Sequence, residues 1–123
     1  MTKAMIKVFR IDKEARIKAP ASDFVGEVYR QRLTEFEREN IILSEQFMVS
    51  VVYFNDGGHN VPHVHEGDHM LIITEGEGLV ATETEQYRVT AGDVVFIPGG
   101  LRHSHGAQPG HSMTQIAILA GNK

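Results

Sequence analysis

An all-β domain is the fold class that the sequence predicts. Twelve glycines and four prolines separate short runs rich in Val, Ile, Phe, Tyr and Thr, which is typical of strands joined by tight turns. The chain has 123 residues, of which 41% are hydrophobic and 23% charged, as expected for one globular domain with a single core. Many short strands in one small domain leave a β-sandwich, a jelly roll or a closed barrel as alternatives.

The expected strands follow one another along the chain with turn residues between them. They cover residues 5–10, 26–33, 44–54, 61–65, 69–84, 85–90, 93–98, 102–107 and 113–120. The breaks carry the sequences NDGGHN, EGEG, TAGD and PGG, which contain the residue types that tight turns require. The stretch LTEFERENI, residues 33–41, is expected to form either a short helical turn or a charged excursion between strands.

Charge and composition exclude several classes of function. Twelve Lys and Arg against sixteen Asp and Glu give a net charge of −4 without a basic block, so we expect no nucleic-acid partner. The longest apolar runs, FMVSVVYF and MLIIT, are too short to span a bilayer, and the N-terminus lacks the apolar run of a secretory signal. We therefore expect no membrane partner and a cytoplasmic location. The absence of cysteine excludes disulfides and thiolate chemistry.

Four of the seven histidines have a spacing that suits metal ligands. His63 and His65 lie two residues apart, so in an extended chain both side chains share one face, about 7 Å apart. Two such imidazoles can converge on one ion, with metal–nitrogen distances of about 2.0–2.1 Å. His69 has the same parity, and His103 follows a Pro-Gly turn after an apolar strand. One His-x-His pair alone is more often a surface feature, but the third and fourth histidines favour a metal site.

The other three histidines are expected to have different roles. His59 and His111 lie in glycine-containing segments, DGGHN and PGHSM, and are expected to be loop residues. His105 shares parity with His103, but two ligands from one edge turn would crowd a metal, so we expect His105 to hydrogen-bond a ligand or to face a substrate. A further alternative is a barrel without metal, in which the histidines hydrogen-bond to one another.

The same residues resemble the two sequence motifs of the cupin superfamily. The first motif is Gly, five residues, His-x-His, three or four residues, an acid, six residues and Gly, and its positions correspond to Gly57, His63, His65, His69 and Gly76. The second motif is Gly, five residues, Pro-x-Gly, two residues and His, and its positions correspond to Gly92, Pro98, Gly100 and His103. The two motifs span residues 57–103, and both spacings agree with this sequence.

Two positions depart from the usual cupin pattern. His69 replaces the usual glutamate ligand, and Ala107 replaces the Asn that often closes the second motif. An all-histidine set is similar to that of the four-histidine cupins, which carry manganese or a related divalent ion. The segments HSHGAQPGHSMTQIAI and FVGEVYRQRL also resemble small cupins related to carboxymuconolactone-decarboxylase-associated cupins, in which Gln more often occupies the position of His69.

The resemblance implies a double-stranded β-helix, which is the jelly-roll barrel of cupins. It implies a single domain over residues 1–123, with N-terminal strands and the excursion in 1–45 and the barrel in 46–120. One divalent ion (Mn, Fe, Ni, Cu, Co or Zn) is expected on four ligands: His63, His65, His69 and His103. Cupins of this size also resemble homodimers, in which the N-terminal segment MTKAMIKVFRI completes the sheet of the partner.

The ligand set determines the charge of the expected site. Four neutral imidazoles leave a divalent site at +2, whereas three imidazoles and a carboxylate leave it at +1, so the all-histidine site is the stronger Lewis acid. We expect a metalloenzyme that acts on a small, oxygenated, anionic organic molecule by dioxygenase-type or isomerase/lyase-type chemistry. The alternative is a cupin that binds or senses a small molecule without converting it. The candidates for further pocket residues are Arg102, His105, Tyr53 and Met113.

Overall fold

The structure is a computed structural model that describes residues 6–36, 41–42 and 46–121. These residues form a short 3-10 turn and twelve strands in this order: η1 (Lys13–Ala15), β1 (Ile17–Lys18), β2 (Phe24–Val25), β3 (Val28–Arg32), β4 (Glu35–Phe36), β5 (Ile41–Ile42), β6 (Phe47–Phe54), β7 (His59–Asn60), β8 (His69–Ala81), β9 (Gln86–Thr90), β10 (Val94–Ile97), β11 (Ser104–Ala107) and β12 (Met113–Ala120). No described helix is long and apolar enough to cross a bilayer.

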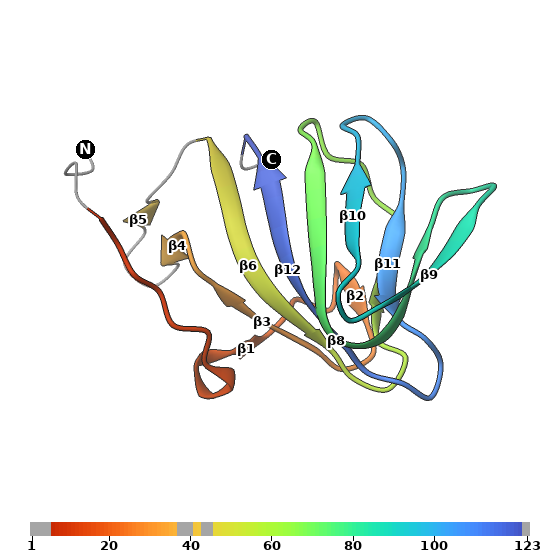
Figure 1. The fold of residues 1–123 in the computed structure, drawn as a ribbon, viewed down its shortest axis with the longest axis horizontal. Helices are drawn as coiled ribbons and strands as arrows, with labels where there is room; N and C mark the ends of the chain where they lie inside the picture. The colour runs from red at the N-terminus through yellow and green to blue at the C-terminus, as the bar shows by residue number, and fades with distance from the viewer. Residues whose placement is uncertain (1–5, 37–40, 43–45, 122–123) are drawn as a thin grey trace.

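Ten of these strands form one antiparallel sheet that curls on itself as a double-stranded β-helix. The strand order is β1-β3-β6-β12-β8-β11-β7-β2, and both β9 and β10 also pair with β8. Figure 1 shows β6, β12, β8 and β10 side by side, with β11 and β9 curving away from them. The expected all-β jelly-roll class is therefore confirmed.

Strand β8 connects the two halves of the sheet. Its first half pairs with β10 and β12, and its second half pairs with β9 and β11. Gly76 lies between the halves with φ +83°, and a Cβ there would collide with the carbonyl oxygen of Ser112. The register against β12 also shifts at Thr114/Gln115, as in a β-bulge. The expected strand 69–84 is therefore found over His69–Ala81, and the expected break at EGEG is wrong, because the chain bends there within one continuous strand.

Alternating side chains of the sheet form the core. Along β12 every second residue is buried, beginning at Met113, because successive side chains of a strand point to opposite faces. The inward residues of neighbouring strands meet in one apolar cluster. Its buried members are Ala19, Val28, Val52, Phe54, Leu71, Ile73, Val80, Val89, Ile97, Ala107, Met113 and Ala117.

Three expected elements differ from the structure. Residues 6–10 form no strand within this chain; the side-chain amide of Gln31 instead donates to the carbonyl of Arg10 and accepts from the N–H of Asp12. The expected strand 61–65 reduces to a single bridge at His63, because no neighbouring strand continues there. In the stretch 33–41, β4 pairs with β5, so the described residues form a short hairpin, while residues 37–40 lie outside the described part of the chain.

Candidate metal centre

Two segments far apart in the sequence meet where the histidines cluster. His63 and His103 exchange backbone hydrogen bonds, with N–H to O distances of 2.9 and 3.0 Å. The N–H of Gly100 donates to the carbonyl of His65 at 2.8 Å, and a Cβ on Gly99 would collide with the carbonyl of Glu66. The Pro-Gly-Gly turn therefore packs directly against the loop that carries the His-x-His pair.

Five imidazoles converge at this point. The ring centroid of His63 lies 4.5 Å from that of His65 and 4.4 Å from that of His103. The ring centroids of His65 and His69 are 5.1 Å apart. Ring nitrogens of two sets of three residues lie within 4.8 Å of one another: His63, His65 and His103, and His69, His103 and His105. The histidines expected as metal ligands from their spacing are thus brought together, and His105 lies beside them.

Backbone carbonyls orient two of these rings. Nδ1 of His63 donates to the carbonyl of Val61 at 2.9 Å, and Nδ1 of His103 donates to the carbonyl of Leu101 at 2.8 Å. A carbonyl only accepts hydrogen bonds, so the proton of each neutral ring is on Nδ1 and the lone pair is on Nε2. Nε2 of His103 is buried without a partner among the described residues. These are the features of imidazoles prepared to bind a divalent transition metal.

Burial keeps the inner histidines neutral. The pKa of His69 is lowered from 6.5 to about 3, mainly by desolvation and additionally by the nearby His65, His103 and His63. Burial also lowers the pKa of His103, against the opposing effect of its hydrogen bond to the carbonyl of Leu101. The pKa of His105 is lowered well below 6.5, again mainly by desolvation. Neutral imidazole is the form that binds metal, so the donor set fits the ion implied by the sequence motifs.

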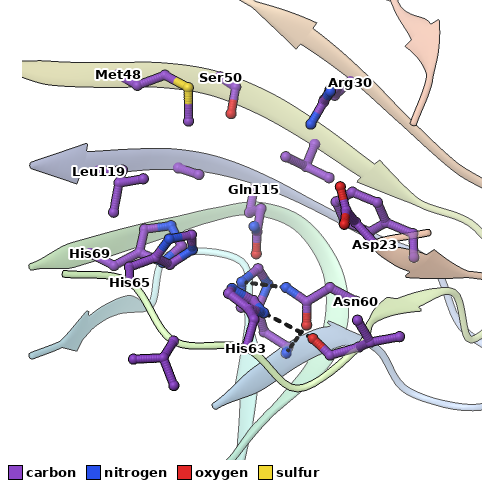
Figure 2. Close-up of a pocket in the computed structure, with 16 residues that line it drawn as sticks. Asp23, Arg30, Met48, Ser50, Asn60, His63, His65, His69, Gln115 and Leu119 are labelled. Carbon is purple, nitrogen blue, oxygen red and sulfur yellow. Dashed lines mark hydrogen bonds between the residues drawn. The ribbon is translucent and has the colours of Figure 1, made fainter. Parts of the chain in front are cut away.

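A cavity of about 280 Å³ opens beside the imidazoles. Figure 2 shows Met48, Ser50 and Arg30 above it, with His63, His65 and His69 on the opposite side. Its remaining lining residues are Asp23, Phe24, Val52, Asn60, Val61, Val64, His105, Gln115, Ala117 and Leu119. The volume is near the lower end of the range for small-molecule sites, and the walls combine apolar side chains with a few polar groups, as such sites usually do.

Gln115 is a pocket residue that the sequence reasoning missed. It lies on β12 with 0% of its surface exposed, and neither amide atom has a hydrogen-bond partner among the described residues. Figure 2 shows its side chain extending into the cavity. The signal was present in the sequence, because Gln115 has the parity of the inward residues Met113 and Ala117 and is the polar residue between them. Buried polar groups are normally paired, so an unpaired amide in a cavity is suited to contact a ligand.

Asn60 was missed for a different reason. It lies in β7, which pairs with β11, and its side chain makes two hydrogen bonds to His105, one to the ring and one to the backbone N–H. Nothing in the local sequence indicates this pairing, because the two residues are 45 positions apart. His105 itself lines the cavity, which is one of the two positions expected for it.

Three of the expected pocket candidates lie elsewhere. Tyr53 points to the opposite face of β6 from the pocket residue Val52, and its ring packs under the guanidinium of Arg16, 5.2 Å from the ring centroid. Met113 points inward but belongs to the apolar core beside Gly78, away from the cavity lining. Arg102 is exposed and lines a separate depression of about 120 Å³.

The two histidines expected to be loop residues lie outside the imidazole cluster. Nδ1 of His59 donates to the carbonyl of Gly57 at 3.0 Å, and the residue is exposed in strand β7, so its expected position in a loop is wrong. Nδ1 of His111 lies 3.4 Å from the carboxylate of Glu77, at the surface. Neither residue lines the cavity.

Comparison with known proteins places the site within a recognised sequence family. A family model described as "Cupin domain" matches residues 50–117, which include all five clustered histidines. The chain is 30% identical over 114 residues to an (R)-mandelonitrile lyase from Granulicella tundricola, covering 92% of this chain and 83% of that protein. It is also 33% identical over 69 residues to the HTH-type transcriptional activator RhaR of Yersinia pseudotuberculosis, covering 56% of this chain but 24% of the activator.

Solved structures share the fold. A cupin-like protein from Thermotoga maritima superposes with a TM-score of 0.77 at 27% identity, covering 94% of this chain and 82% of that one. KdgF from a Halomonas species superposes with a TM-score of 0.73 at 20% identity, and 96% of each chain is covered. At 20% identity, the similarity to KdgF concerns the fold alone.

Proposed function

The chain belongs to the cupin domain family, and from this premise we propose that it is a metal-dependent lyase that cleaves a small α-hydroxynitrile into a carbonyl compound and cyanide. The proposal selects the lyase branch of the chemistry expected from the sequence, and it replaces the expected anionic substrate with one that becomes anionic during the reaction. It is supported by the similarity to the (R)-mandelonitrile lyase, which extends over most of both chains.

The observation that carries the proposal is the cluster of imidazoles, of which His69, His103 and His105 are buried, at the side of a small, largely apolar cavity. We infer that four residues would hold one divalent ion: His63, His65, His69 and His103. When bound there, such an ion acts as a Lewis acid that stabilises negative charge on a substrate oxygen. Elemental analysis of the purified protein identifies the bound metal among the six candidates.

The cavity walls suit an uncharged substrate that becomes anionic during the reaction. Val52, Ala117 and Leu119 provide an apolar surface for the organic group of the substrate. Apart from the histidines, the charged lining residues are Asp23 and Arg30, whose formal charges are opposite and cancel. In the lyase reaction the hydroxyl loses its proton and its O–H electron pair forms the second bond of the carbonyl group. The bond to the nitrile carbon breaks with its electron pair on cyanide, and cyanide takes up one proton, so that the products are the carbonyl compound and HCN.

Turnover of racemic mandelonitrile by metal-loaded protein tests the proposal. Benzaldehyde formation is followed by absorbance and cyanide by a colorimetric assay, with protein loaded in parallel with Mn, Fe, Co, Ni, Cu or Zn. His111→Ala is the matched control, because His111 is exposed and lies outside the cavity. We expect activity in the wild type and the control, and its loss in His103→Ala. Failure of every metal form to release benzaldehyde above the uncatalysed rate contradicts the proposal.

A second candidate function is small-molecule binding without turnover. The observation that favours it is the similarity to RhaR, a transcriptional activator of which the matched segment covers 24%. A binding module would show thermal stabilisation by hydroxylated ligands such as sugars and hydroxy acids, without product. The same samples therefore distinguish the two functions, because stabilisation and benzaldehyde release are measured separately.

We also propose that two copies of the chain associate. Phe96 on β10 lies opposite Met70 on β8, and Val94 is two residues before Phe96 on the same strand. The side chain of Val94 is 60% exposed and that of Phe96 is 58% exposed. Neighbouring exposed apolar side chains on one sheet face are typical of protein–protein interaction sites. A homodimer through this face is thus supported by the surface, and the molar mass in solution tests it.

A further inference from the structure

The contact between Asn60 and His105 determines where the proton of a cavity imidazole lies. Asn60 is on β7 and His105 on β11, and both side chains are buried. The backbone N–H of His105 donates to Oδ1 of Asn60 at 2.9 Å, and Nδ2 of Asn60 lies 2.9 Å from Nε2 of His105. The asparagine side chain therefore contacts the histidine twice, once at its backbone and once at its ring.

The backbone contact fixes the orientation of the amide. A backbone N–H can only donate, so the atom of Asn60 that faces it must be the acceptor oxygen. The amide nitrogen then faces Nε2 of His105, and an amide nitrogen can only donate. Nε2 must consequently carry its lone pair, because a proton there would set two N–H groups against each other. The proton of the neutral His105 ring is thus on Nδ1.

His105 differs in this respect from the two histidines oriented by carbonyls. In His63 and His103 the carbonyl contact at Nδ1 leaves the Nε2 lone pair available for a metal. In His105 the Nε2 lone pair is already engaged by Asn60, and Nδ1 is protonated. Distance alone groups His105 with His69 and His103, but neither nitrogen of His105 has a lone pair to offer.

Nδ1 of His105 is buried and has no hydrogen-bond partner among the described residues, although the residue lines the cavity. A buried N–H normally finds an acceptor. We propose that Asn60 is a positioning residue that holds His105 as an Nδ1–H donor toward the cavity, outside the metal ligand set, where it hydrogen-bonds an oxygen or nitrogen acceptor of the bound small molecule. This inference rests on the proposed function only for the identity of that acceptor, which in a hydroxynitrile is the hydroxyl oxygen or the nitrile nitrogen.

Nitrogen NMR of the histidine rings tests the proton position without reference to activity. The protein is labelled with ¹⁵N-histidine and loaded with Zn²⁺, which is diamagnetic, and long-range ¹H–¹⁵N spectra identify the protonated nitrogen of each ring. We expect His105 to show a protonated Nδ1 and a free Nε2. In Asn60→Asp the carboxylate can accept from both the backbone N–H and the ring, so we expect the proton of His105 to move to Nε2. A wild-type spectrum with a protonated Nε2, or with a metal-bound His105 nitrogen, overturns the proposal.

Zinc content gives a second readout that does not depend on turnover. We expect His105→Gln to bind one zinc per chain as the wild type does, and His103→Gln to lose most of it. Equal loss in both variants overturns the assignment of His105 outside the ligand set. Failure of the lyase proposal gives a different result. If the proton position and the zinc content are as expected but mandelonitrile is not cleaved, the inference about His105 holds and the lyase proposal is contradicted.

Discussion

Replacement of Gln115 by methionine should stabilise the ligand-free protein while impairing its function. Gln115 is fully buried, and both its amide oxygen and its amide nitrogen lack partners among the described residues. A buried group left without a hydrogen bond costs about 1–3 kcal/mol. The lower end of this range, about 1 kcal/mol for each atom, gives about 2 kcal/mol for the amide. Methionine has a similar unbranched shape and removes this cost without leaving a void.

The gain is measured by urea unfolding of metal-free protein at pH 7. A change of about 2 kcal/mol in the free energy of unfolding corresponds to an increase in Tm of roughly 8 °C for a chain of this length. Gln108 provides the matched control, because Gln108→Met changes a half-buried glutamine that lies outside the cavity lining. We expect little change in stability there.

The functional half of the prediction follows from the position of the amide in the cavity. If Gln115 contacts the bound small molecule, Gln115→Met should lower kcat/KM for mandelonitrile at least tenfold, as the loss of one hydrogen bond of about 1.4 kcal/mol does. A variant that is less stable than the wild type, and turns over substrate equally well, refutes the reasoning on both counts.

Four further predictions concern the metal, pH, the surface and the backbone. His103→Ala should lose most bound metal by elemental analysis, whereas His111→Ala should retain it. The pKa of His69 is about 3 in the folded state and about 6.5 in the unfolded state. The contribution of this residue to the stability of the metal-free protein should therefore be complete above pH 6.5 and decrease toward pH 3, by up to about 1.4 kcal/mol per pH unit. Urea unfolding at several pH values checks this, and a flat profile contradicts it. Phe96→Glu should shift the protein from dimer to monomer in light scattering, and a wild type that is already monomeric disproves the proposed association. Gly76→Ala should destabilise by more than about 2 kcal/mol in the same unfolding assay, since the φ of +83° is strained for alanine and its Cβ would meet the Ser112 carbonyl; an unchanged midpoint contradicts this.

The elements predicted correctly are those whose alternation of buried and exposed residues can be read within one short stretch of sequence. The strand 113–120 has the same bounds in the structure, because its inward and outward residues alternate without interruption. The EGEG segment was wrongly predicted to be a turn, because Gly76 lies at a bend within β8. Glycine is needed there because a Cβ would collide with the carbonyl of Ser112, which lies in another part of the chain. The segment 5–10 alternates like a strand, but the described residues 6–10 find no partner strand within the chain.

The candidate site was also predictable from the sequence only in part. The cupin resemblance, drawn from motif spacing, is confirmed by the family model, and the structure brings the four proposed ligands together with His105. Their role as metal ligands stays a prediction. Gln115 could have been found from strand parity, whereas Asn60 could not, since its contact with His105 depends on the pairing of β7 with β11. Tyr53 was misplaced because nothing in the sequence showed which face of its strand lines the cavity.

The reciprocal backbone bonds between His63 and His103 also bear on the order of folding events. These residues are 40 positions apart, so the chain must close a long loop before the two rings can share an ion. The sheet pairings that bring them together, through β8, β11 and β12, all join distant segments. Metal capture should therefore be a late step, and the ion would select chains that have already closed the barrel. In a refolding experiment, the rate of metal uptake would then follow completion of the sheet and would not increase with metal concentration.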